Sequence, residues 1–235
     1  MDAALQFARG PLFVACFLLM VLGLSRLIFL RVYEYRRAWK RAARDHFPFG
    51  RALRDMGKWL VPVTHIYRAS PAIGVLSFLF HIGLILVPIF LAEHVLLWRR
   101  GVGFGWSALP PAIADGLTIL TIVTGLGLLG FRIFKSAARF MSQVADYLLL
   151  VLLLIPFVSG LLASHPMWNP FSYQLTMLVH VLAGDLVLGV MPFTKLSHAV
   201  LFPFERMSSE VYWRFPAGAG DRVADALHGK EPAVL

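Results

Sequence analysis

Four histidines in two apolar segments are the residues of this sequence whose spacing points most directly to chemistry. His180 and His198 lie eighteen residues apart on one apolar run. That spacing corresponds to five helical turns and would place both imidazoles on one face of a straight helix. His81 and His94 lie on a second apolar run. Ionisable groups inside a membrane are costly and commonly functional, and paired imidazoles are ligands for haem iron. The pattern predicts two bis-histidine b haems stacked between two helices.

Depth in the membrane predicts how these histidines pair. If the two runs are antiparallel, His81 and His198 share the inner level, and His94 and His180 share the outer level. His81 and His94 are thirteen residues apart, which gives an ideal helical offset of about 140°. Pro88 lies between them and is expected to kink or re-phase the helix.

Other residues near the expected haem levels are assigned supporting roles. Gly83 and Gly184 would let a flat macrocycle approach the helix backbone. Lys195 lies at the inner level, where a haem propionate needs a cation. His165, in the connection before the last apolar run, is the alternative to His94 as the outer partner of His180.

The predicted haem ligands must be positioned by membrane-spanning helices. The composition of the chain indicates that such helices are present. Hydrophobic residues make up 58% and charged residues 15% of the 235 residues, whereas a soluble domain carries about 25% charged residues. Five apolar runs are long enough to span a bilayer, namely residues 12–30, 72–98, 116–134, 147–164 and 175–202. The sequence predicts an all-α integral membrane protein. Its five-helix bundle occupies residues 1–202, including a cytoplasmic loop at 31–70, and a cytoplasmic tail follows at 203–235.

The formal net charge of +9 comes from basic residues whose distribution along the chain is typical of a membrane protein and does not indicate a nucleic-acid-binding surface. Residues 31–68 hold ten Lys or Arg against three acidic residues, whereas the connection between the fourth and fifth runs has no basic residue. The positive-inside rule then places the amino terminus outside and the carboxyl terminus inside. Anionic lipid or an acidic partner accounts for the charge, and no nucleic-acid partner is expected.

The last apolar run resembles the last helix of respiratory nitrate reductase gamma subunits. That family has a histidine, a glycine four residues later, then Pro-Phe-Ser/Thr-Arg/Lys-Leu and a second histidine. Here His180, Gly184 and the string Pro-Phe-Thr-Lys-Leu-Ser that precedes His198 match the pattern. Phe80-His81-Ile82-Gly83 is similar to the family's first ligand motif. The resemblance covers about residues 10–202.

One position departs from that family. Its outer histidine on the second helix follows the inner one by ten residues, whereas here that position is Leu91 and His94 comes one turn later. The loop at 31–68 and the string Ala114-Asp115-Gly-Leu-Thr118 look more like related membrane subunits coupled to heterodisulfide-reductase-like or sulfite-reduction iron–sulfur proteins.

The resemblance implies a dihaem cytochrome b subunit of a respiratory oxidoreductase in a prokaryotic cytoplasmic membrane. Such a subunit exchanges electrons with menaquinone or ubiquinone, as quinol oxidase or quinone reductase. It passes them to or from a cytoplasmic iron–sulfur subunit, which would dock on loop 31–70 and the C-terminal tail. The implied quinone pocket lies at the outer ends of the second and third helices, with the candidate residues Glu93, Arg99, Arg100 and Asp115.

A non-redox membrane protein is the competing interpretation. A small transporter or an assembly factor could use the same histidines to bind a metal or relay protons. Metal transporters, however, gather acidic and sulfur ligands at one depth, whereas these histidines occupy two depths.

Overall fold

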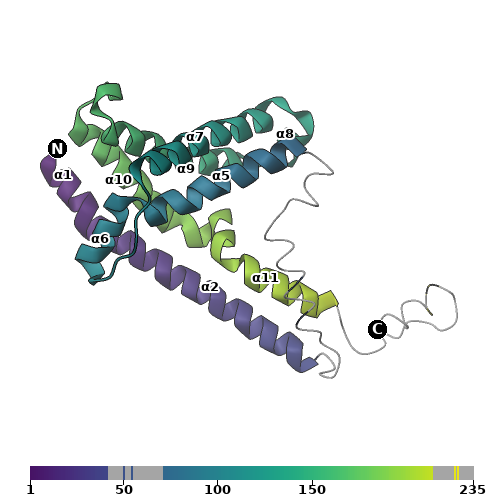
Figure 1. Cartoon of the computed structure of the whole chain (residues 1–235). Helices are drawn as coiled ribbons and strands as arrows, with labels where there is room; N and C mark the ends of the chain where they lie inside the picture. The colour runs from purple at the N-terminus through teal and green to yellow at the C-terminus, as the bar shows by residue number, and fades with distance from the viewer. Residues whose placement is uncertain (42–49, 51–53, 55–70, 214–224, 226, 228–235) are drawn as a thin grey trace. The chain divides into compact units, whose positions relative to one another are not determined.

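The computed structural model describes residues 1–41, 50, 54, 71–213, 225 and 227, and the regular elements among them are all helices (Figure 1). In chain order the elements are α1 (Asp2–Phe7), η1 (Ala8–Leu12), α2 (Phe13–Arg41), α5 (Pro71–Phe90), α6 (Ala92–Val102), α7 (Pro111–Phe134), α8 (Ser136–Met141), α9 (Val144–Ser164), η3 (Pro166–Trp168), α10 (Tyr173–Val190), η4 (Met191–Phe193), η5 (Lys195–Ser197) and α11 (His198–Trp213).

Five helical segments are long and apolar enough to cross a membrane, which confirms the expected all-α architecture and the number of spans. They are Asp2–Arg37, Pro71–Phe90, Pro111–Phe134, Val144–Ser164 and Tyr173–Phe193. Their large apolar side chains often face outward: Leu22 is 67% exposed and Val123 is 59% exposed. A soluble protein buries such side chains, whereas a surface of this kind suits lipid.

Local signals in the sequence set several helix ends. α7 begins with Pro111 at its first position, where the missing N–H costs nothing. α9 begins with a capping box in which the backbone N–H of Gln143 donates to Asp146 Oδ2 at 2.9 Å. α6 ends at Gly103, whose φ of 76° is the left-handed conformation that glycine adopts without strain.

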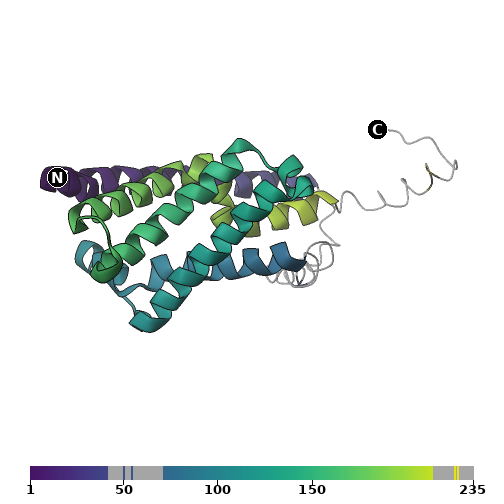
Figure 2. The same cartoon turned by 90° about the horizontal axis from the view of Figure 1, so that it is seen from above.

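The described residues form two compact units, which are considered separately. The first comprises residues 1–17 and 71–188, and the second comprises residues 18–41 and 189–213. In the first unit α5 packs along α7, and α7 packs against α9 (Figure 1, Figure 2). Phe80, Leu150 and Leu154 form the apolar centre of this three-helix group.

Small residues bring α5 and α7 close together. A Cβ atom added at Gly83 would lie 1.8 Å from Thr121 Oγ1 and 2.7 Å from the Leu117 carbonyl oxygen. A Cβ atom at Gly125 would lie 2.9 Å from the Phe80 ring and 2.6 Å from Leu154. Close backbone approach through glycine is a common means of packing membrane helices.

The second and fifth apolar runs are each interrupted, and in the second run the break follows Pro88, where a kink or re-phasing was expected. Leu91, with φ −64° and ψ 133°, separates α5 from α6. The fifth run leaves α-helix after Val190, passes through η4 and η5, and resumes at His198. The assumption that a straight helix carries both His180 and His198 on one face was therefore wrong.

Two residues explain the interruption of the fifth run. Pro192 supplies no backbone N–H to continue the helix. Thr194 is extended, with φ −127° and ψ 177°, and its hydroxyl accepts a hydrogen bond from the Leu196 N–H. Pro192 also fills the space beside Gly23 of α2 within the second unit, where an added Cβ would lie 2.5 Å from the proline Cβ.

Within the second unit, Arg31 of α2 forms an ion pair inside its own helix and another with α11. Arg31 lies 3.1 Å from Glu34 and 3.5 Å from Glu205 of α11. Most of the expected docking loop at 31–70 and the tail beyond Trp213 lie outside the described residues; the chain continues as α11 through residues 203–213.

Candidate functional site

The interruption at Leu91 positions His94. The change of backbone direction leaves the last carbonyls of α5 without their usual helical partners. The Phe90 carbonyl accepts from the Leu109 N–H at 2.8 Å, and the Ile89 carbonyl accepts from Trp106 Nε1 at 2.9 Å. The Pro88 carbonyl pairs with His94 Nδ1 at 3.0 Å. The end of α5 therefore holds the His94 ring in place.

The rings of His94 and His180 are near-parallel neighbours in the first unit. Their ring centroids are 6.1 Å apart, and the ring planes differ by 22°. The structure therefore brings together the two histidines that depth matching assigns to the outer level.

The spacing of these rings is close to that of two axial ligands of one iron ion. A metal-bound imidazole nitrogen lies about 2 Å from its metal, so two such nitrogens lie about 4 Å apart and the ring centres about 6 Å apart. The Nδ1 atoms of both rings face backbone carbonyls: that of His94 faces Pro88, and that of His180 faces Pro156 at 2.8 Å. Metal-binding histidines commonly donate their second nitrogen to such an acceptor, which fixes the ring and leaves the other nitrogen for the metal.

Burial favours the neutral form of His94. Loss of water around the ring lowers the pKa of His94 below its ordinary value of 6.5, and this effect exceeds the opposing effects of the Pro88 carbonyl and Glu93. Neutral imidazole is the form that binds metal.

Sequence reasoning missed the part of α9 that supports His180. A Cβ atom added at Gly160 would lie 2.9 Å from His180 Cε1 and 3.1 Å from Nδ1, so only glycine leaves room for this ring position. One turn earlier, Pro156 provides the carbonyl oxygen that pairs with His180. A glycine four residues after a proline in an apolar helix was the available signal.

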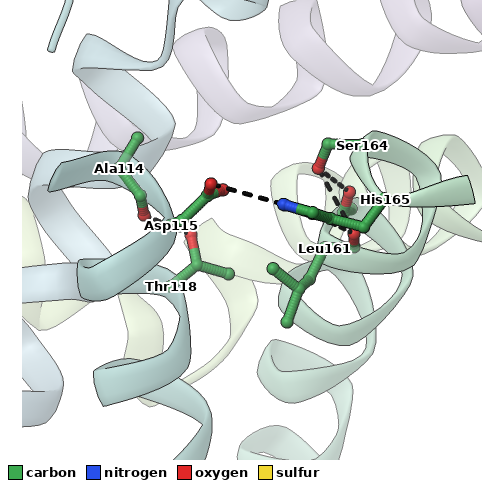
Figure 3. A network of polar contacts seen from close by, with 7 residues as sticks. Ala114, Asp115, Thr118, Leu161, Ser164 and His165 are labelled. Atoms are coloured by element: carbon green, nitrogen blue, oxygen red, sulfur yellow. Dashed lines mark hydrogen bonds and ion pairs between the residues drawn. The ribbon is translucent and has the colours of Figure 1, made fainter. Parts of the chain in front are cut away.

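His165, the alternative outer partner, is engaged elsewhere. Its Nε2 atom lies 3.4 Å from Asp115 Oδ2, and its Nδ1 atom lies 3.1 Å from the Leu161 carbonyl oxygen (Figure 3). Its ring stacks on Trp168 with centroids 4.5 Å apart. The structure pairs His180 with His94 and not with His165.

The inner histidines lie in different units. In the first unit, His81 Nδ1 lies 2.6 Å from the Ser77 carbonyl oxygen, and its ring meets Phe80 edge-on at 5.7 Å. In the second unit, His198 Nδ1 pairs with the carbonyl of Lys195, whose side chain is exposed. Both rings therefore use Nδ1 in the same way as the outer pair.

The two candidate glycines have different surroundings. Gly83 faces Thr121 and packs α5 against α7, which accounts for the glycine without a cofactor. Gly184 on α10 has open space around the position of a Cβ atom. Next to it, Asp185 is 2% exposed, and its Oδ2 atom has no hydrogen-bond partner among the described residues.

The candidate quinone-pocket residues fall into two groups. Glu93, Arg99 and Arg100 are exposed on α6, with the acid in its first turn and the bases in its last turn, where each complements the helix dipole. The Arg99 side chain packs beside Gly105. Asp115 belongs to α7 and pairs with His165.

Within the part of the chain that the structure describes, no cluster of three or more His, Cys, Asp or Glu side chains could hold a metal ion. An iron porphyrin differs from a bare ion because it requires only two axial protein ligands. The His94–His180 pair provides two neighbouring imidazoles.

The structure is a helical protein with five segments long and apolar enough to span a membrane. His94, just after the second of these segments, lies beside His180 of the fifth. The chain is 38% identical over 206 residues to a protein of Nitratidesulfovibrio vulgaris that bears no functional name, and the match covers 85% of this chain and 89% of that protein. The chain belongs to the same family as this protein. No protein-family model and no solved structure matches it.

Proposed function

We propose that this chain is the membrane-anchor cytochrome b subunit of a respiratory oxidoreductase complex. In this role it moves electrons between the quinone pool and a cytoplasmic iron–sulfur subunit, in the cytoplasmic membrane of a prokaryote. The observation that carries the proposal is the His94–His180 pair, with its 6.1 Å centroid separation and its near-parallel rings.

Two b haems are the proposed cofactors, and haem b supplies one-electron transfer when it is bound. His94 and His180 would hold the outer haem. Their Nδ1 contacts to Pro88 and Pro156 fix the rings and leave Nε2 of each as the nitrogen that would bind iron.

His81 and His198 are the other two proposed haem ligands. The Nδ1 contacts to Ser77 and Lys195 support this role, because they resemble those of the outer pair. The Lys195 ammonium group would pair with a propionate. The open space at Gly184 suits the approach of a flat macrocycle to α10.

The proposed orientation has the amino terminus outside and the carboxyl terminus inside. The ten basic residues in 31–68 support it, because Lys and Arg concentrate on the cytoplasmic side. The same loop and the C-terminal tail would bind the iron–sulfur subunit. Quinol would bind at the outer end, near Glu93, Arg99, Arg100 and Asp115.

Spectroscopy of the purified chain tests the proposal. The full-length protein, produced in a host that makes sufficient haem, should show reducible b-type α and Soret bands. A pyridine haemochrome assay should give two haems per chain. A protein that folds and purifies well without haem would reject the proposal and favour a transporter or assembly factor.

A further inference from the structure

A polar pair joins the start of α7 to the end of α9, close to the proposed outer haem ligands. Asp115 Oδ2 lies 3.4 Å from His165 Nε2 (Figure 3). The two side chains are 39% and 28% exposed, respectively. Both side chains are therefore only partly covered by the rest of the protein.

Both ring nitrogens of His165 face hydrogen-bond acceptors. Its Nδ1 atom lies 3.1 Å from the Leu161 carbonyl oxygen, and its Nε2 atom faces the Asp115 carboxylate. Carbonyl and carboxylate oxygens only accept hydrogen bonds, whereas a neutral imidazole carries a single N–H. A neutral His165 can satisfy one of these acceptors, and a protonated His165 satisfies both.

The other groups around the pair are uncharged and engaged. The Thr118 hydroxyl donates to the Ala114 carbonyl at 2.7 Å, and the Ser164 hydroxyl donates to the Gly160 carbonyl at 2.8 Å. Trp168 covers one face of the His165 ring, with an angle of 11° between the rings. Asp115 is thus the charged group that faces His165 among the described residues.

α9 connects this pair to His180. Gly160 contacts the His180 ring, and His165 follows it by five residues. At 1.5 Å per residue, His165 lies about 7.5 Å further along the helix axis. The pair therefore lies at the end of α9, less than two turns beyond the contact with His180.

We propose that His165 and Asp115 form the proton acceptor for quinol oxidation at the outer end of the bundle. This inference rests on the proposed function and adds the route of the protons. A quinol that becomes a quinone loses two protons and two electrons. The two proposed haems, as ferric iron, would accept the two electrons, one each. A hydroxyl proton passes to His165 Nε2, and the imidazolium so formed pairs with the Asp115 carboxylate. Release of that proton to the outer water prepares the pair for the second one.

Stopped-flow reduction of the full-length haem protein tests this route, with menadiol as the electron donor. Asp115→Asn and His165→Gln should each slow haem reduction by menadiol by about 100-fold, the range of general base catalysis. Dithionite, which needs no proton acceptor on the protein, should reduce both variants as fast as the wild type.

Two further variants separate chemistry from structure. Ser164→Ala removes a neighbouring hydroxyl that bonds only within its own helix and should keep the wild-type rate. Asp115→Glu keeps a carboxylate and should recover part of the rate that Asp115→Asn loses.

Each other outcome counts against the route. Wild-type rates in Asp115→Asn and His165→Gln, with haem spectra intact, would overturn it while leaving the proposed function in place. Loss of a haem signal in His165→Gln would show that His165 is an iron ligand. Absence of haem from the wild-type protein would reject both proposals.

Discussion

The Nδ1 atom of His180 lies 2.8 Å from the carbonyl oxygen of Pro156, a contact between α10 and α9. The carbonyl can only accept a hydrogen bond, so the proton of a neutral His180 lies on Nδ1 and the lone pair lies on Nε2. The ring is thereby prepared as a ligand on the side away from α9, and several predictions about the outer haem depend on this arrangement.

Replacement of either outer histidine should remove one haem. In His94→Ala and His180→Ala the iron loses an axial ligand, so haem content should fall from two to one per chain. One of the two transitions in a redox titration should disappear. His165→Gln is the matched control and should keep both haems, because its ring nitrogens face Asp115 and Leu161. The ligand assignment is wrong if the outer transition survives loss of His94 and disappears with His165.

Gly160→Ala should disturb the outer haem without any change of ligand. The new methyl group would lie 2.9 Å from His180 Cε1, so the ring must move away from Pro156. We expect a shifted midpoint potential or reduced occupancy of the outer haem, with the inner haem unchanged. Gly130→Ala adds the same methyl group to α7 in open space and should leave both potentials unaltered. Equal spectra and potentials for the two variants would contradict the proposed role of Gly160.

Gly83→Ala should destabilise the contact between α5 and α7. The added Cβ would overlap Thr121 Oγ1 and approach the Leu117 carbonyl to 2.7 Å. Overpacking of this kind costs about 1–3 kcal/mol, measurable as a lower thermal midpoint in detergent. Thr121→Ala in the same chain should restore part of the loss because it removes the hydroxyl, whereas Thr121→Ser should not. An unchanged midpoint in Gly83→Ala would refute this packing.

The haem-free protein should lose stability on acidification partly through His94. Burial places the pKa of folded His94 below the ordinary value of 6.5. The unfolded chain then binds more protons than the folded one as the pH falls below 6.5, and stability decreases until the lowered pKa is passed. The thermal midpoint of protein made without haem should drop from pH 7 toward pH 5, and His94→Gln should reduce that drop. A His94→Gln profile parallel to the wild type would exclude this contribution.

Hydropathy was sufficient to predict the spans, and two of the predicted ends, at Phe134 and Ser164, agree with the structure. It did not predict the break at Leu91 or the one after Val190. At both places apolar side chains continue through the break, whereas the change lies in backbone torsion angles. Pro192 was visible as a possible cause, but its effect depends on the hydrogen bonds that Thr194 makes afterwards.

One contact of the candidate site, that between His94 and His180, could be predicted from the depth of each residue along its apolar run. The levels of His94 and His180 follow from counting residues in antiparallel runs, and the structure brings these rings together. The hydrogen bond between His180 and the Pro156 carbonyl could not be predicted, because every residue has a backbone carbonyl whatever its side chain. The pairing of Asp115 with His165 joins positions fifty residues apart and depends on how α7 and α9 align.

The extended backbone at Leu91 also bears on how such sequences diverge. Because α6 starts anew after Leu91, the interval between His81 and His94 is set by a turn and not by helical periodicity. Insertions or deletions near this turn can alter the interval while the same two rings are retained. Relatives of this protein are therefore expected to vary in the number of residues between these histidines, and search patterns with a fixed interval will overlook them.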